Sequence, residues 1–351
     1  MQAKAAARMR ILLCSHFFSP SIGGTEQVGQ VLATEFSVAG HTVKVVTSTA
    51  ESDGTIFLFE VIRRPSLLKL LKLVLWSEVV FHNNISLRLY WPLAFVRRPW
   101  VIAHHTWITR TDGSIGLRDR LKQFMIRYAR NIAVSQSVAD HLHAPAFVIS
   151  NPYRDDLFLR ESSGVRDRDL IFLGRLVRDK GADILLDALR LLREQNFLPK
   201  LTIVGAGPEL ANLRKMAEEF RLVEQVVFLG TQTGKALVEL LNRHRIIVVP
   251  SRWQEPFGLV ALEGIACGCR AIAARTSGLV EATGGLAVTF EHENPVALAC
   301  AIKRTLIEGF DWEKYWQTSE ELLRPRAARA VAERYLDVFA SAVRESVQRN
   351  Q

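Results

Sequence analysis

Two glutamates in the second half of the chain lie in a setting that suits a phosphate-containing ligand. Glu255 is part of a proline- and glycine-rich loop at residues 250–258, and Glu263 follows in an apolar segment. That segment predicts a helix, and its first amides, those of Leu259 and Val260, have no partner within a helix and suit a phosphate. A carboxylate among apolar neighbours is costly unless it is paired, so we expect a bonding partner for Glu263.

A cationic turn lies in the same half of the chain. Arg175 and Lys180 follow a predicted buried strand at residues 170–173 and precede a predicted helix at residues 183–193. Ligands of open α/β sheets bind at the carboxyl ends of the strands, where such cations can neutralise an anion. By contrast, Asp167 and Asp169 form a D-x-D pattern that precedes its strand, so we expect no metal site there.

Glycines and histidines recur at other predicted strand ends. Gly23 and Gly24 follow a strand at residues 10–14, and glycine lets a backbone approach a ligand closely. A tight structural turn is the better explanation of an isolated Gly-Gly pair, but the position of this pair after the first strand, together with two other motifs described below, favours a ligand loop. His104 and His105 end a strand at residues 100–104, and residues 204–209, V-G-A-G-P-E, lack the third glycine of a dinucleotide fingerprint.

Strands and helices alternate in two series along the 351 residues. The first series has predicted strands at residues 10–14, 42–47, 57–62, 79–83, 100–104, 131–135 and 147–149. The second has strands at residues 170–173, 201–204, 226–229, 246–249 and 270–274, and helices at 183–193, 209–220 and after Phe257. The sequence therefore predicts an α/β protein with two Rossmann-like, doubly wound domains facing across a cleft.

The domain boundaries follow from breaks in this alternation. Turn-forming residues at 150–156 separate the two series. We expect an N-terminal domain at residues 1–150, a C-terminal domain at 151–325 and a closing amphipathic helix within 326–351.

Three motifs together resemble those of the retaining glycosyltransferases of family 4, the glycosyltransferase group 1 type, which have the GT-B fold. The most specific is E-P-F-G-L-V-A-L-E-G-I-A-C-G, from Glu255, and the others are G-R-L-V-R-D-K-G, from Gly174, and the glycine loop at residues 21–26. The resemblance covers nearly the whole chain. It departs at Arg270, where a proline is usual, and in the short loop after Glu281.

The resemblance implies a role for each matched residue. Glu255 would contact the donor sugar, Glu263 the ribose hydroxyls, and Arg175 and Lys180 the diphosphate. The active-site histidine is His104 by its spacing to Trp107, or His105 by the usual strand length. The remaining donor-binding residues implied are Gly23, Gly24, Gly205, Gly230, Thr231, Phe257, Gly258, Leu259 and Val260.

The implied function is transfer of a hexose, with retention of configuration, from a nucleotide-diphosphate sugar to an acceptor hydroxyl. The nucleotide sugar is a co-substrate, and no metal or other cofactor is implied. The acceptor would be a glycan or a lipid-linked glycan, in polysaccharide, lipid-linked glycan or glycolipid synthesis. Two alternatives are a nucleotide-sugar epimerase of the same fold and a non-catalytic nucleotide-sugar binding protein. The donor base, the sugar and the acceptor depend on a few pocket side chains that the motifs do not specify.

The distribution of charge and of apolar residues indicates which classes of partner the protein could bind. Most of the net charge of +9 lies in the first 150 residues, which hold 17 Lys and Arg against 9 Asp and Glu, a surplus of 8. Without a nucleic-acid motif, this bias indicates an anionic membrane or acceptor, or merely a solvated basic face. Residues 66–76, with Lys69 and Lys72 on one helix face, predict either a membrane-surface helix or, the favoured alternative, a helix packed on the sheet.

Composition also indicates the compartment. No segment reaches the ~20 apolar residues of a spanning helix, and no signal-peptide pattern is visible. The four cysteines lack metal-ligand spacing, so we interpret Cys14, Cys267, Cys269 and Cys300 as reduced core thiols. We expect a cytoplasmic protein that could lie peripherally at the inner face of the membrane.

Overall fold

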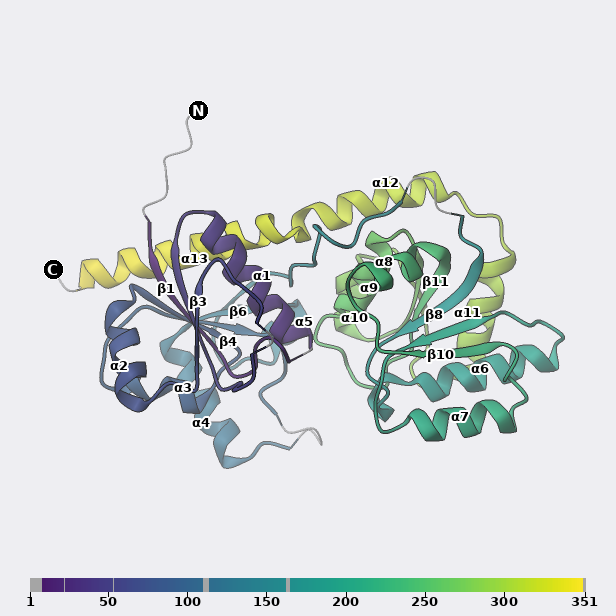
Figure 1. The fold of residues 1–351 in the computed structure, drawn as a ribbon, viewed down its shortest axis with the longest axis horizontal. Helices are drawn as coiled ribbons and strands as arrows, with labels where there is room; N and C mark the ends of the chain where they lie inside the picture. The colour runs from purple at the N-terminus through teal and green to yellow at the C-terminus, as the bar shows by residue number, and fades with distance from the viewer. Residues whose placement is uncertain (1–7, 22, 53, 110–113, 162–164, 350–351) are drawn as a thin grey trace. The chain divides into compact units, whose positions relative to one another are not determined.

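The computed structural model describes residues 8–21, 23–52, 54–109, 114–161 and 165–349, which belong to two compact units (Figure 1). Unit 1 is Met1–Pro152 with Arg326–Gln351, and unit 2 is Tyr153–Pro325. Each unit contains one sheet of parallel strands, which confirms the predicted pair of α/β sheets. Within the described ranges, no helix is long and apolar enough to cross a membrane.

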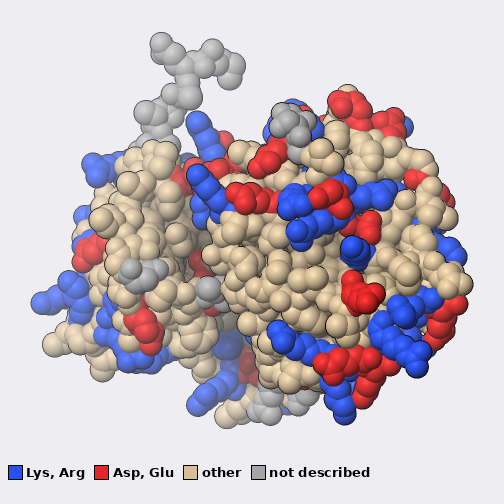
Figure 2. All heavy atoms as spheres, turned by 45° about the vertical axis from the view of Figure 1, so that its right-hand side comes forward, with Lys and Arg blue, Asp and Glu red and all other residues tan. Residues whose placement is uncertain are grey.

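Unit 2 contains a six-stranded sheet whose order is β10-β9-β8-β11-β12-β13. The strand order reverses beside β8, so the loops that follow β8 and β11 leave the sheet at the position where such folds bind ligands. On the part of unit 2 visible in Figure 2, basic and acidic side chains intermingle. Its strands are β8 (Arg168–Leu173), β9 (Leu201–Val204), β10 (Val226–Gly230), β11 (His244–Val249), β12 (Arg270–Ala274) and β13 (Val288–Phe290). Its helices are α6 (Ala182–Glu194), α7 (Leu210–Glu219), α8 (Gly234–Arg243), α9 (Leu259–Ala266), α10 (Ser277–Thr283), α11 (Pro295–Ile307) and α12 (Trp312–Leu323).

Unit 1 contains a seven-stranded sheet whose order is β3-β2-β1-β4-β5-β6-β7. Its strands are β1 (Arg10–Ser15), β2 (Thr42–Thr47), β3 (Glu60–Arg63), β4 (Val79–Asn83), β5 (Trp100–His104), β6 (Arg130–Ala133) and β7 (Ala146–Val148). Its helices are α1 (Gly24–Val38), α2 (Leu67–Trp76), α3 (Leu87–Tyr90), α4 (Leu117–Met125), α5 (Gln136–Asp140) and α13 (Ala328–Arg349). Two 3-10 helices, η1 (Trp91–Ala94) and η2 (Ile126–Tyr128), continue α3 and α4.

Helices α1 and α13 cover one face of the unit 1 sheet. Phe36 of α1 meets Phe339 of α13 with ring centroids 5.3 Å apart, and Phe81 of β4 meets Tyr335 at 5.6 Å. Tyr335 and Phe339 are fully buried, and Arg334 of the same helix donates to the carbonyl of Val148 at 2.8 Å. The last helix is therefore part of the core of unit 1.

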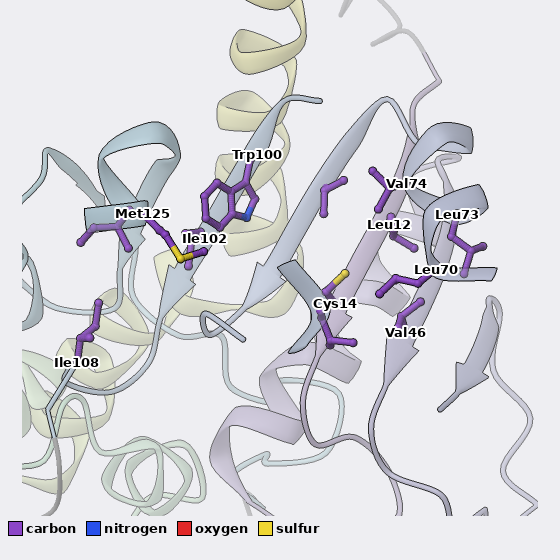
Figure 3. Close-up of a cluster of buried hydrophobic side chains, with 13 residues drawn as sticks. Leu12, Cys14, Val46, Leu70, Leu73, Val74, Trp100, Ile102, Ile108 and Met125 are labelled. Atoms are coloured by element: carbon purple, nitrogen blue, oxygen red, sulfur yellow. The ribbon is translucent and has the colours of Figure 1, made fainter. Parts of the chain in front are cut away.

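The opposite face of this sheet is covered by α2, α3, η1 and α4 (Figure 3). Leu12 and Cys14 of β1 point to this face, because successive strand residues alternate between faces. They pack in one cluster with Leu70 and Leu73 of α2 and with Met125 of α4. The other side of these helices faces outward.

The cysteines do not form disulfides within the described residues, and all four are free. Burial raises the pKa of Cys14 and of Cys269 to about 12, so both are neutral thiols. The expectation that all four lie in the core is wrong for Cys300, which is exposed. It lies on α11, on the side opposite to the buried Leu298 and Ile302.

Candidate active site

The turn after β8 and the loop after β11 are bonded to each other. The carbonyl of Asp179 accepts from the amides of Arg252 at 2.8 Å and Trp253 at 3.2 Å. Gly181 has a left-handed φ of +69°, and a Cβ there would lie 2.0 Å from the carbonyl oxygen of Pro250. Only glycine allows this approach, which brings together two segments that are about 70 residues apart in the sequence.

Lys180 and Glu255 meet at this junction. The Lys180 ammonium donates to Oε1 of Glu255, and the Ser251 hydroxyl donates to the same oxygen at 2.8 Å. The Glu255 side chain is 12 % exposed and that of Lys180 is 28 % exposed. Both bonds use Oε1, so Oε2 can still accept from a ligand hydroxyl. A Cβ on Gly278 of α10 would lie 1.9 Å from the Glu255 carbonyl oxygen, so the backbone of Glu255 is tightly packed.

The helix after this loop begins without a side-chain cap. Gly258, with φ +107°, is the N-cap of α9, and Phe257 before it is 3 % exposed and anchors the loop in the core. The amide of Ala261 donates to the Gly258 carbonyl. The amides of Leu259 and Val260 have no such partner among the described residues, so this helix start can receive an anion.

Glu263 is 6 % exposed in the middle of α9. Its negative charge acts on Arg154, whose guanidinium donates to both carboxylate oxygens of Asp156 at 2.9 and 2.6 Å. The pKa of Arg154 is raised by the hydrogen bond to Asp156, and also by the charges of Asp156 and Glu263, against the lowering effect of burial. The sequence analysis missed Arg154, because it lies among the turn-forming residues interpreted as a linker.

Arg175 lies where the loops after β8, β9 and β10 join. A Cβ on Gly205, which has φ +144°, would lie 1.8 Å from the carbonyl oxygen of Gly174, and the Gly205 amide donates to the Gly230 carbonyl at 2.8 Å. The absence of a side chain at Gly205 therefore allows the loop after β9 to pack closely against the loop after β8. Arg175 and Thr231 are exposed beside this junction.

The remaining predicted site residues lie in unit 1. Gly23 is the N-cap of α1 with an extended φ of −178°, and Gly24 begins the helix and is exposed. His104 ends β5 and His105 follows it, both at the carboxyl edge of the sheet. Ile22 of the glycine loop lies outside the described residues.

The two histidines differ in their partners. His104 Nε2 lies 3.0 Å from Oδ1 of Asn131, an amide oriented by its own bond to the Ile126 carbonyl. His105 Nδ1 lies 2.8 Å from Oδ1 of Asn151, and its backbone amide donates to Asn84 Oδ1. We assign Nδ1–H to His105 from this geometry, which leaves Nε2 as an acceptor. Nε2 of His105 is buried and has no partner among the described residues.

Burial determines the charge of both rings. It lowers the pKa of His104 and of His105 to about 4, although the hydrogen bonds to Asn131 and Asn151 act in the opposite direction. Both imidazoles are therefore neutral at pH 7. A neutral His105 can accept a hydrogen bond from a hydroxyl through Nε2.

The two aspartates of the D-x-D pattern form contacts with other residues of unit 2. Asp167 pairs with Arg243, and Asp169 accepts from the Lys200 amide at 3.0 Å. Across the part of the chain that the structure describes, no three His, Cys, Asp or Glu side chains gather in a way that could hold a metal ion.

Sequence comparison relates unit 2 to a family of glycosyltransferases. Residues 155–321 match the family described as "Glycosyl transferases group 1". An uncharacterized glycosyltransferase of Methanocaldococcus jannaschii is 33 % identical over 177 residues, covering 47 % of this chain and 42 % of that protein. A D-inositol 3-phosphate glycosyltransferase of Corynebacterium jeikeium is 38 % identical over 127 residues, covering 34 % of this chain and 30 % of that protein. The chain thus covers less than half the length of these two relatives.

The likeness in fold extends over both units. A crystal structure of Anabaena HepE in complex with UDP and glucose has a TM-score of 0.77 at 18 % identity, covering 95 % of this chain and all of that one. Sequence similarity to the curated relatives thus spans about half of the chain, whereas similarity of fold spans nearly all of it.

Proposed function

Because unit 2 belongs to the glycosyl transferases group 1 family and the whole chain has the GT-B fold, we propose that the protein is a retaining glycosyltransferase. It transfers a sugar, of the hexose type, from a nucleoside-diphosphate sugar to an acceptor hydroxyl. The observation that carries this proposal is the contact of Lys180 and Ser251 with Glu255, in the loop that leads to the uncapped start of α9. Cation, carboxylate and free amides are the groups that a sugar diphosphate requires.

The donor groups can be assigned to these residues. The diphosphate accepts hydrogen bonds from the amides of Leu259 and Val260 and forms ion pairs with Lys180 and Arg175. A sugar hydroxyl donates to Oε2 of Glu255. The ribose hydroxyls donate to Glu263, whose negative charge also acts on Arg154.

The reaction exchanges one bond at the anomeric carbon for another. The bond from that carbon to the phosphate oxygen breaks, while the acceptor oxygen forms its bond on the same face. The acceptor proton passes to the leaving phosphate, so configuration is retained without a protein nucleophile. The protein contributes position and electrostatic stabilisation of the charge that develops on the diphosphate.

Of His104 and His105 in unit 1, we propose His105 as the one that binds a sugar hydroxyl, because its Nε2 has no partner among the described residues whereas Nε2 of His104 is used by Asn131. Changing His105 to alanine is expected to lower kcat/KM by roughly 5- to 150-fold, the value of one hydrogen bond of about 1–3 kcal/mol. The matched change His104→Ala is expected to lower the melting temperature, and to lower kcat/KM by less than His105→Ala does. Steady-state kinetics and thermal unfolding of both variants decide the assignment, and a larger kinetic loss in His104→Ala reverses it.

The experiment that tests the function is an assay of UDP-, GDP- and ADP-sugars with a panel of glycan and lipid-linked acceptors. UDP-glucose is the first donor to try, since the related fold of HepE has been crystallised with it. D-inositol 3-phosphate is one acceptor to include, given the name of the Corynebacterium relative. We expect release of the nucleoside diphosphate together with a glycosylated acceptor, in the presence of EDTA. An isomeric nucleotide sugar formed without acceptor indicates an epimerase, and binding without turnover a non-catalytic protein.

We expect this activity in the cytoplasm, in polysaccharide, lipid-linked glycan or glycolipid synthesis. Free thiols, including the exposed Cys300, suit a reducing compartment.

A further inference from the structure

Helix α4 and the 3-10 turn η2 that follows it expose four large apolar side chains. Leu117 is 84 % exposed, Leu121 49 %, Phe124 53 % and Tyr128 70 %. Their spacing of four, three and four residues places them within an arc of about 60° on a helix with 3.6 residues per turn. The rings of Phe124 and Tyr128 touch, with centroids 5.4 Å apart. We call these four residues the α4 stripe.

Helix α2, on the same side of the unit 1 sheet, also exposes apolar side chains. Its residues Leu70, Leu73 and Val74 are buried in the cluster of Figure 3, whereas Leu67 and Leu68 are 69 % and 72 % exposed. Phe95, which follows η1, is 80 % exposed. Figure 1 shows α2, α3 and α4 on one side of the unit 1 sheet.

Positive charge is concentrated in the segment of the sequence that contains these helices. Residues 64–130 hold 12 Lys and Arg against 3 Asp and Glu, a surplus equal to the net charge of the whole chain, +9. Arg118, Arg120 and Arg127 are exposed and flank the α4 stripe on the helix. The one acidic residue of α4, Asp119, accepts from the Gly116 amide at 3.0 Å and lies 3.9 Å from the Lys122 ammonium. No unpaired acidic group of α4 therefore opposes an anionic partner.

A cavity at the edge of α2 adds a place for a phosphate group. It is lined by Arg64, Arg88, Ser48 and Trp91, among other residues, and contains no carboxylate in its lining. The Ser48 hydroxyl and the Trp91 indole N–H are buried and have no partner among the described residues. Both can donate to a phosphate oxygen.

We propose that the outer face of α2, η1 and α4 binds the surface of an anionic lipid bilayer. The α4 stripe and the α2 leucines would insert among the lipid headgroups, and the flanking arginines would bind the lipid phosphates. A second copy of the chain is a poor occupant, because it would bring two surfaces of like charge together. For α2, the prediction that Lys69 and Lys72 lie in water is correct, but Leu67 and Leu68 are exposed as well.

Co-sedimentation with lipid vesicles tests this proposal without any nucleotide sugar, so its outcome is independent of catalytic activity. The full chain is mixed with vesicles of phosphatidylcholine, alone or with roughly one third phosphatidylglycerol, at low and high salt. We expect binding to the anionic vesicles, weaker binding at high salt, and little binding to the neutral vesicles. Absence of binding to anionic vesicles at low salt overturns the proposal.

Two double variants identify the surface. Leu121→Glu with Phe124→Glu removes half of the α4 stripe and is expected to lower partitioning by about tenfold or more. Leu198→Glu with Val223→Glu adds the same charge in unit 2, at side chains that are 54 % and 62 % exposed, and is expected to bind almost as the wild type does. Equal binding by the α4 variant, or equal losses in both variants, contradicts the assignment. If the α4 variant fails to fold, Arg118→Gln with Arg120→Gln is expected to lower anionic binding, and wild-type binding by that variant counts against the proposal.

Discussion

Replacing Lys180 with alanine is expected to lower kcat by about 10²- to 10³-fold, the loss that follows removal of one preorganised donor to a developing charge. The Lys180 ammonium is held by Oε1 of Glu255, beside the turn that Asp179 joins to the loop after β11. It needs little reorganisation to meet a diphosphate, so its contribution should be largest in the transition state. Steady-state kinetics with the donor identified by the panel measures the loss of kcat. A binding measurement with the same donor shows how much of the contribution of Lys180 is already present before the reaction.

The matched control is Arg178→Ala. Arg178 lies in the same 3-10 turn and is exposed, and only its backbone carbonyl bonds to Arg252. We expect kcat to change by no more than about twofold, as for a surface substitution. Wild-type kcat in Lys180→Ala, or an equal loss in Arg178→Ala, means that Lys180 is not the diphosphate ligand.

Glu255 provides a coupled test of the same pair. Glu255→Gln should also lower kcat strongly, because it weakens both the bond from Lys180 and the acceptor offered to the sugar. Since the two side chains act through one contact, the losses of the single variants should not add in the double variant. Additive losses would indicate that the two residues act independently.

Changing Gly205 to alanine is expected to lower the free energy of unfolding by about 3 kcal/mol or more, the upper range for a residue forced into a strained conformation. The added Cβ would lie 1.8 Å from the carbonyl oxygen of Gly174, and φ of +144° is a backbone conformation that alanine avoids. The loops after β8 and β9 would have to separate. Urea unfolding of the purified variant measures the loss.

Gly230→Ala is the control for this prediction. Gly230 also has a positive φ, +70°, but nothing lies within 4 Å of the added Cβ. Gly230→Ala should therefore lower the free energy of unfolding by about 1–2 kcal/mol, the cost of the left-handed conformation alone. Equal losses at both positions would show that the contact with Gly174 does not matter. A loss of donor affinity at Gly205 with unchanged stability would instead support the predicted role in the nucleotide pocket wall.

The strands were predictable where they are buried on both faces, because such strands are continuous apolar runs. Strands β4, β5, β9 and β12 have the predicted bounds. Strand β3 begins three residues later than predicted, since Phe57 and Phe59 stack on each other before the ladder starts. The strand β13, which has only three residues at the edge of the sheet, was not predicted, and neither was the helix α8.

The sequence predicts the residues of the candidate site but not the contacts between them. The motifs identified Lys180 and Glu255, yet their direct contact depends on the strand order that places β8 beside β11. Arg154 could not be found from the sequence, because nothing in its turn distinguishes a guanidinium near Glu263 from one in water. The two histidines were equivalent by spacing, and only their amide partners, Asn131 and Asn151, separate them.

Binding of a nucleoside-diphosphate sugar to the full chain, in the absence of any acceptor, tests the central claim most directly. Thermal unfolding is followed with UDP-, GDP- and ADP-sugars, and the stabilising donor is then titrated by calorimetry against wild type and Glu263→Gln. A donor at a hundred times its Kd should stabilise the fold by about 2.7 kcal/mol. We predict that at least one donor stabilises the wild type and binds more weakly to Glu263→Gln, which lacks the buried charge offered to the ribose. No stabilisation by any donor, or equal affinity in the two proteins, would contradict this account of the site.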